Sequence, residues 1–352
     1  MNNCGGEKRR SVSMNRIASL FLAVLLCFTA IMAFSTVPVA AKAAPKLSAK
    51  SVTIVKGGKQ TIKLKNGKGS WTIKGNGVAK ITKKTKTSVT ITPLKAGNTV
   101  VTCKVGKKNL TCKIKVLNNK VGSVNDMYLP AVIVGKSFSH KFSLPKGVSY
   151  MGNEYDKKIG KLTVITNMNS VTGETAVSMT IKAIKPGRFK CNLYYQEGEE
   201  IVGETVNFVF INGFRGKAKA KKTDANYKAW RKKTISTMVK ADMSTWEIIN
   251  AIGCLISSGK YSSKGGATGK QLWFGGNGTC VSGAQMMDDF MKDLGISSKI
   301  HFMGNKGGAT DIYGFNIMYM SQHKNTWITL SGKKFELNAQ PGGMWPIGTV
   351  KR

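Results

Sequence analysis

Apolar and polar residues alternate along most of the stretch from Leu47 to Leu117, and this alternation constrains the fold more than any other feature of the chain. A two-residue period places every second side chain on one face of a β-strand, and short runs of this kind predict a small β-sandwich. Turn residues separate the runs, as at Gly57-Gly58 and Asn66-Gly67. The alternating apolar residues are Val52, Ile54, Ile62, Leu64, Trp71, Ile73, Val89, Ile91, Val101, Cys103, Val105, Leu110, Cys112, Ile114 and Val116. We therefore expect an all-β module over residues 44–118.

The same module is strongly cationic. Nineteen lysines and no acidic residue lie between residues 42 and 118, and they supply half of the net charge of +38. Only seven of the chain's 55 basic residues are arginine. Lysine is a solvated point charge that suits diffuse attraction to polyanions, whereas the planar readout of nucleic-acid bases favours arginine. We therefore expect anionic cell-wall polymers or a polysaccharide as a partner, and we do not expect nucleic acid.

The N-terminal 43 residues have the pattern of an export signal. Lys8, Arg9 and Arg10 precede an apolar run from Ile17 to Phe34, and a stretch rich in small residues follows it. This order is typical of a signal peptide, whose removal would leave a secreted or cell-surface protein without a further membrane span. A retained membrane anchor is the alternative, because the apolar run approaches the roughly 20 residues that cross a bilayer.

Residues 119–213 are expected to form a second β module. The segment Thr90–Gly97 matches Thr180–Gly187 at an offset of ninety residues, and each consists of a predicted strand, a turn that ends in glycine and the start of another strand. The stretch 47–117, with its central Trp71, resembles the bacterial Ig-like group 2 family. That resemblance implies a surface-exposed spacer or adhesion module without catalysis.

Two cysteines flank the turn Gly106–Asn109 in the first module. If Val105 pairs with Leu110, Cys103 falls opposite Cys112 on the same face, where an exported protein could hold a disulfide. Two small buried thiols are the alternative, and the sequence leaves both open.

The C-terminal third changes character after a basic linker expected over residues 214–234. Ser244 and Glu247 have the spacing of a capping box and predict a helix start. Further along, a glycine-rich turn leads into Cys280, and an apolar stripe with helical spacing continues to Gly295. Cys280 is therefore predicted at a helix N-terminus, where the helix dipole lowers a thiol pKa from about 8.5.

A β-hairpin is predicted after this helix. His323 is predicted at the start of the first strand, a tight turn at Ser331-Gly332-Lys333 connects the two strands, and Asn338 is predicted at the end of the second. A cysteine at a helix start, a histidine base and an asparagine that orients the imidazole would form a nucleophile, base and orienting group. The helical cysteine alone has another interpretation, a buried and inert core thiol.

These residues carry a second family resemblance. Gly278-x-Cys280-x-x-x-Ala284, followed by Leu294-Gly-Ile296, resembles the nucleophile helix of the transglutaminase-like (transglutaminase/protease core) superfamily. His323, Gly332 and Asn338 reproduce the spacing of the family's second block, in which Asn338 stands where the family usually has Asp. The resemblance implies an α+β, papain-like domain over residues 235–352 that acts on amide bonds of a protein or peptide, as a peptidase, an amidase or an acyl transferase. An alternative register at Tyr313-Gly-Phe-Asn316 would lack the base.

The remaining candidates are assigned structural roles. We expect His301 and Cys254 to be core residues, and His140 to have no functional partner. The polar side of the Cys280 helix, with Asp288, Asp289 and Asp293, is expected to face solvent. Three histidines and no cysteine–histidine cluster at zinc spacing argue against a metal site, and we expect no cofactor. The competing function is non-catalytic: a wall-binding protein with a degenerate transglutaminase-like fold.

Overall fold

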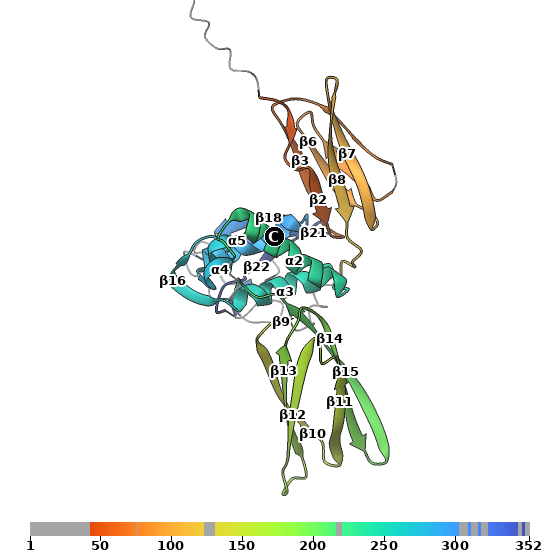
Figure 1. Cartoon of the computed structure of the whole chain (residues 1–352), viewed down its shortest axis with the longest axis vertical. Helices are drawn as coiled ribbons and strands as arrows, with labels where there is room; N and C mark the ends of the chain where they lie inside the picture. Colours follow the sequence, from red (N-terminus) through yellow and green to blue (C-terminus); the bar gives the residue numbers. More distant parts are fainter. Residues whose placement is uncertain are drawn as a thin grey trace, which may run out of the picture. The chain divides into compact units, whose positions relative to one another are not determined.

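The computed structural model describes residues 43–75, 77–122, 131–215, 220–302, 309–310, 316–317, 323–343 and 347–348 (Figure 1). By its internal contacts the chain divides into two units, Met1–Ala44 and Pro45–Arg352. The predicted export signal lies almost wholly outside the described residues, as does Tyr313 of the alternative register. Among the described residues, no helix is long and apolar enough to cross a membrane.

The first β module consists of two four-stranded sheets that enclose one core. One sheet has the order β1-β3-β6-β5 and the other β2-β8-β7-β4. Their strands are β1 (Lys46–Leu47), β2 (Ser51–Ile54), β3 (Gln60–Lys65), β4 (Ser70–Ile73), β5 (Ala79–Lys84), β6 (Ser88–Pro93), β7 (Gly97–Val105) and β8 (Lys108–Val116). Ile62 and Ile91 of the first sheet share a buried cluster with Val101 and Ile114 of the second. The alternation in the sequence is thus the alternation between this core and an exposed face that carries lysines.

The register of the β7–β8 hairpin differs from the expected one. Val105 pairs with Lys108, so Cys103 lies opposite Leu110 and Cys112 lies opposite Val101. Both cysteines are buried free thiols. The reason lies in the turn, which contains only two residues because Gly106 adopts a positive φ of 58°. Of the two possibilities that the sequence left open, the structure therefore has the two buried thiols and not the disulfide.

The second β module also has two sheets, with the orders β10-β13-β12 and β11-β14-β15-β9. Its strands are β9 (Ala131–Ile133), β10 (Ser137–Leu144), β11 (Val148–Tyr155), β12 (Gly160–Met168), β13 (Thr175–Ala183), β14 (Gly187–Glu197) and β15 (Glu200–Ile211). Ile181 of one sheet and Phe189 of the other are fully buried in a common cluster. This module therefore has a core of its own.

The two similar segments of the sequence occupy equivalent places in the two modules. Thr90–Gly97 covers the end of β6 and the start of β7, which belong to different sheets, and Thr180–Gly187 does the same for β13 and β14. Gly97 and Gly187 have nearly the same backbone angle, with φ of 140° and 148°. A residue with a side chain rarely adopts this conformation, so each glycine allows the chain to cross from one sheet to the other.

The C-terminal part combines helices with short sheets. The helices are α2 (Asp224–Lys240), α3 (Thr245–Ser257), α4 (Gly269–Gly275) and α5 (Cys280–Asp293), and α2 begins within the expected linker. The largest of its sheets is antiparallel, with the order β18-β21-β22-β23. The strands are β16 (Lys260–Gly266), β17 (Asn277–Gly278), β18 (Ser297–Phe302), β19 (Ala309–Thr310), β20 (Asn316–Ile317), β21 (Lys324–Leu330), β22 (Lys333–Leu337) and β23 (Ile347–Gly348). Strands predominate in the described chain as a whole.

Candidate active site

The helix that carries Cys280 begins and ends as the sequence predicts. Cys280 is the first residue of α5, and Thr279 occupies the N-cap position. The N–H of Thr279 donates a hydrogen bond of 2.9 Å to the hydroxyl of Ser282. This bond holds the N-cap residue against the first turn of the helix. At the other end, Gly295 adopts a φ of 68°, and the N–H of Ile296 donates to the carbonyl of Met291. This closing pattern satisfies the last carbonyls of the helix.

Gly278, two residues before Cys280, occupies a position where a side chain would not fit. Gly278 belongs to β17, which pairs with β16, and its backbone lies directly against Gly265. A Cβ at Gly265 would lie 2.6 Å from the Cα of Gly278, and a Cβ at Gly278 would overlap the hydroxyl of Ser282. Glycine at both positions therefore allows the strand pair to reach the start of α5 and to fix the backbone that leads into Cys280.

The predicted hairpin holds the other two candidates. Strands β21 and β22 are joined by a two-residue turn in which Ser331 and Gly332 have φ of 50° and 83°. His323 directly precedes β21 and Asn338 directly follows β22. Because the strands are antiparallel, the two residues emerge at the same end of the hairpin. The predicted hairpin is confirmed, but its turn is one residue shorter than expected because Lys333 already pairs with Leu330 as the first residue of β22.

The structure brings Cys280, His323 and Asn338 together. The imidazole of His323 is hydrogen-bonded to the Cys280 thiol. Its Nε2 lies 2.5 Å from Oδ1 of Asn338, where the ring N–H donates to the amide oxygen. An imidazole has two ring nitrogens and can bond both neighbours at once. Asn338 is 7% exposed, whereas Cys280 and His323 are partly exposed.

The surroundings favour charge separation between the thiol and the imidazole. The pKa of Cys280 is lowered from 9.0, chiefly by the hydrogen bond with His323 and with smaller help from the N–H groups of Lys324 and Val281, while burial opposes the shift. Burial lowers the pKa of His323, but hydrogen bonds to Cys280 and Asn338 outweigh it and the pKa is raised from 6.5. The opposite shifts of the two pKa values stabilise a thiolate–imidazolium pair.

Helix α5 is fixed against the hairpin close to this cluster. The hydroxyl of Thr326 on β21 donates a buried hydrogen bond of 2.9 Å to the carbonyl of Ala284. Gly283 lies so near the chain after β22 that a Cβ there would be 2.5 Å from the carbonyl oxygen of Ala339. These two contacts hold the first turns of α5 in register with both strands, and hence Cys280 in register with His323 and Asn338.

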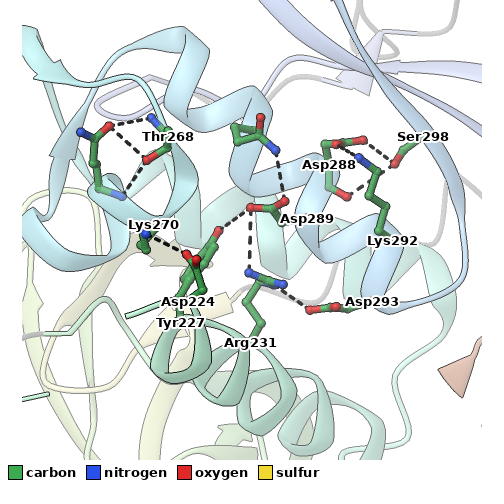
Figure 2. Close-up of polar contacts among 12 residues, drawn as sticks. Asp224, Tyr227, Arg231, Thr268, Lys270, Asp288, Asp289, Lys292, Asp293 and Ser298 are labelled. Carbon is green, nitrogen blue, oxygen red and sulfur yellow. Dashed lines mark hydrogen bonds and ion pairs between the residues drawn. The ribbon is translucent and has the colours of Figure 1, made fainter. Parts of the chain in front are cut away.

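The polar side of α5 does not face solvent, and the expectation for Asp288, Asp289 and Asp293 was wrong (Figure 2). Helix α2 packs against it. Nε of Arg231 lies 2.6 Å from Oδ2 of Asp293, and the hydroxyl of Tyr227 donates to Asp289 at 3.0 Å. Asp288 is 2% exposed and binds Lys292 and the hydroxyl of Ser298.

The pKa of Asp289 reflects this burial. Removal from water raises it, and the Arg231 guanidinium and the Tyr227 hydroxyl only partly oppose the shift. The helix's own periodicity could not reveal the network, because the partners of Asp289 and Asp293 come from a helix about sixty residues earlier in the chain. Tyr227 and Arg231 are therefore supporting residues that the sequence analysis missed.

The residues assigned structural roles have identifiable surroundings. His301 on β18 stacks on Trp327 with ring centres 3.7 Å apart. His140 on β10 is exposed, and its ring stacks with Phe138 and Phe142. Cys254 is a free thiol on α3, and burial raises its pKa to about 11. These three side chains remain assigned to packing.

The comparisons with known proteins give no family. No family model matches the chain, and no curated protein matches it. Among solved structures, domains 4–9 of the surface layer protein SbsC are 16% identical over 48% of this chain, with a TM-score of 0.20, and the match spans only 31% of that structure.

Two further solved structures have similarly low scores. The tandem Ig domains of titin are 11% identical over 48% of this chain and 97% of theirs, with a TM-score of 0.18. A cysteine protease inhibitor from Entamoeba histolytica is 14% identical over 23% of this chain and 85% of its own, with a TM-score of 0.19. Likenesses at this level carry no argument about function.

Proposed function

We propose that this chain is a secreted or cell-surface cysteine enzyme of the transglutaminase-like type that acts on amide bonds of a protein or peptide. One observation carries the proposal: the His323 ring is hydrogen-bonded to the Cys280 thiol on one side and to Asn338 on the other. In this proposal, the C-terminal part is the α+β, papain-like domain that the sequence resemblance implies, and the two β modules are Ig-like spacers.

The first half of the reaction uses the charge-separated pair. The Cys280 thiolate attacks the amide carbonyl carbon, and the new C–S bond places negative charge on the carbonyl oxygen. The Cys280 backbone N–H, at the start of α5, is oriented to stabilise such an oxyanion. When the C–N bond breaks, the leaving amine takes a proton from the His323 imidazolium, and a thioester remains on Cys280.

The second half restores the enzyme. Neutral His323 takes a proton from an incoming water or amine as that group attacks the thioester carbonyl. The C–S bond breaks, which regenerates the thiolate beside an imidazolium and releases a carboxylic acid or a new amide. Water gives a peptidase or amidase, and an amine gives an acyl transferase. Asn338 holds the ring in place in both halves.

The first β module supports retention on an anionic polymer. Lys104, Lys113 and Lys115 are exposed on one face of the β2-β8-β7-β4 sheet, and no acidic residue occurs in this module to neutralise them. Clustered cations of this kind attract teichoic acids or acidic polysaccharide through long-range electrostatics. This observation also favours the second candidate function, a non-catalytic wall-binding protein.

A trapping experiment decides between the two functions. A protein or peptide library with activated amide or ester groups is incubated with the protein lacking residues 1–43, and the mass of the Cys280 peptide is measured. An enzyme gives a thioester adduct at Cys280 that decays in the presence of water or an added amine. The Cys280→Ser variant controls for adducts elsewhere. A Cys280 that gains no acyl group with any substrate would leave only the wall-binding function.

A further inference from the structure

The hydrogen-bond partner of His323 carries no charge. Asn338 accepts a hydrogen bond from the ring N–H, which orients the ring and raises the pKa of His323, but the amide supplies no negative charge. His323 is partly buried, and the loss of water around the ring disfavours its charged form. A carboxylate close to the ring would compensate for this loss.

Glu336 occupies a suitable position. It lies on β22 two residues before Asn338, and side chains two apart along a strand project from the same face. Backbone pairing sets Thr326 of β21 opposite Leu337 and Trp327 opposite Glu336. Asn338 directly follows β22 and bonds the His323 ring, so Glu336 lies on the strand face from which this bond is made.

Phe335 and Leu337 on the opposite face of β22 pack against the rest of the C-terminal part. Phe335 contacts Trp246 of α3 edge to face, with ring centres 4.7 Å apart, and Leu337 belongs to the buried core of the C-terminal part. Glu336 therefore projects from the other face of β22, and yet it is only 7% exposed. Glutamate is rarely buried to this extent unless its charge interacts with another group.

We propose that Glu336 is a positioning residue whose carboxylate serves as the counter-ion of the His323 imidazolium, supplying from the same face of β22 the negative charge that Asn338 lacks. The inference rests on the proposed function. Electrostatics agree with the geometry: burial lowers the pKa of His323, the bonds to Cys280 and Asn338 raise it, and the Glu336 carboxylate raises it further. Glu336 would thereby favour the thiolate on Cys280 without touching the substrate.

Other charged groups near this face have the opposite sign. Lys324 begins β21, Lys334 lies on β22, and Lys299 on β18 stands over the Trp327 ring at 5.1 Å. His301 also stacks on the Trp327 ring. Positive charge on the three lysines disfavours an imidazolium at His323. Their presence makes the contribution of a buried carboxylate more important.

The test is an equilibrium titration that needs no substrate. The chain has only three histidines, so NMR can follow the ring signals of His140, His301 and His323 separately across pH. In Glu336→Gln, His323 should lose its proton at lower pH than in the unmodified protein, and labelling of Cys280 by iodoacetamide near pH 6 should slow by about threefold or more. His140 should titrate unchanged. Lys334→Gln, on the same strand, should not lower the His323 pKa.

A charge relocation gives the sharpest outcome. Asn338→Asp added to Glu336→Gln returns a carboxylate to the ring and should restore the higher His323 pKa. An unchanged His323 titration in folded Glu336→Gln, or no recovery in the double variant, overturns the proposal. If Glu336→Gln does not fold, the carboxyl of Glu336 is followed by ¹³C NMR in His323→Gln, where it should titrate at higher pH because the coupling is reciprocal. These titrations can fail while Cys280 still forms a thioester, and the reverse also holds.

Discussion

Gly283 of α5 and Ala339 after β22 approach so closely that no side chain fits between them, with 2.5 Å from the ideal Cβ position to the Ala339 carbonyl oxygen. Gly283→Ala should therefore push the first turn of α5 away from the chain that carries Asn338. We expect a loss of about 1–3 kcal/mol of stability and a reduced thiolate character of Cys280. Thermal unfolding and the rate of iodoacetamide labelling measure the two effects. Gly75→Ala, at a position with nothing within 4 Å, is the matched control and should change neither.

Cys280 should be the most reactive thiol of the described chain. Its pKa is lowered, whereas burial raises the pKa values of Cys112, Cys191 and Cys254 to about 11. A thiol with a lowered pKa stays ionised as pH falls, so labelling of Cys280 should persist from about pH 8 to about pH 6, where an ordinary thiol slows nearly tenfold per unit. Peptide mass spectrometry after brief labelling measures the order in which the cysteines react.

The His323→Ala variant tests whether His323 or the helix start causes the reactivity of Cys280. Loss of the hydrogen bond that contributes most to the lowered pKa should move the titration of Cys280 to higher pH and slow its labelling near pH 7 by about tenfold or more. Rapid labelling that is unaffected by the substitution would mean that the helix start alone activates the thiol. His301→Ala, on β18, serves as the control for loss of an imidazole.

Sequence patterns predicted the local features of the site because neighbouring residues alone determine them. The capping box at Ser244 and Glu247, the helix start at Cys280 and its end at Gly295 are present as expected, and the hairpin turn is present without Lys333. Each depends on residues within about one turn of helix or one hairpin. A single sequence contains this information directly.

Other features could not be read from local patterns. The sequence left the state of Cys103 and Cys112 open because the length of the turn between them sets the pairing, and the two-residue turn places neither cysteine opposite the other. The aspartates of α5 are covered because α2 packs on that side of the helix. The sequence alone did not indicate a role for Glu336, because an acidic residue in a predicted strand does not reveal whether its side chain is buried.

Arg231 should be important for stability. Its side chain is 10% exposed and pairs with Asp293, which is 17% exposed. Arg231→Ala would leave two carboxylates partly buried without their cation, and we expect a loss of about 2–3 kcal/mol of unfolding free energy. Chemical denaturation measures it. Lys270→Ala, which removes an exposed ion pair with Asp224, should cost about 0.5 kcal/mol or less. Equal losses in the two variants would contradict the importance of the Arg231 network.

Wall retention should depend on the lysines of the first module. Replacement of Lys104, Lys113 and Lys115 by Gln should weaken binding of the protein lacking residues 1–43 to teichoic-acid-bearing walls, and binding of the unmodified protein should fall steeply with salt. Co-sedimentation over a salt series measures both. The control replaces three exposed lysines of the second module, Lys141, Lys161 and Lys182. Binding that persists in molar salt would rule out electrostatic retention.

The ion pairs between α2 and α5 have a practical consequence for dissecting the chain. A fragment cut at residue 235 would lack Tyr227 and Arg231, and the helix that carries Cys280 would lose the side chains that cover Asp289 and Asp293. Thr223 caps α2 by accepting a hydrogen bond from the N–H of Asn226. The shortest fragment fit for expression and assay should therefore start upstream of Thr223, and a protease that cuts within α2 should inactivate the protein even though the cut lies far from the nucleophile in sequence.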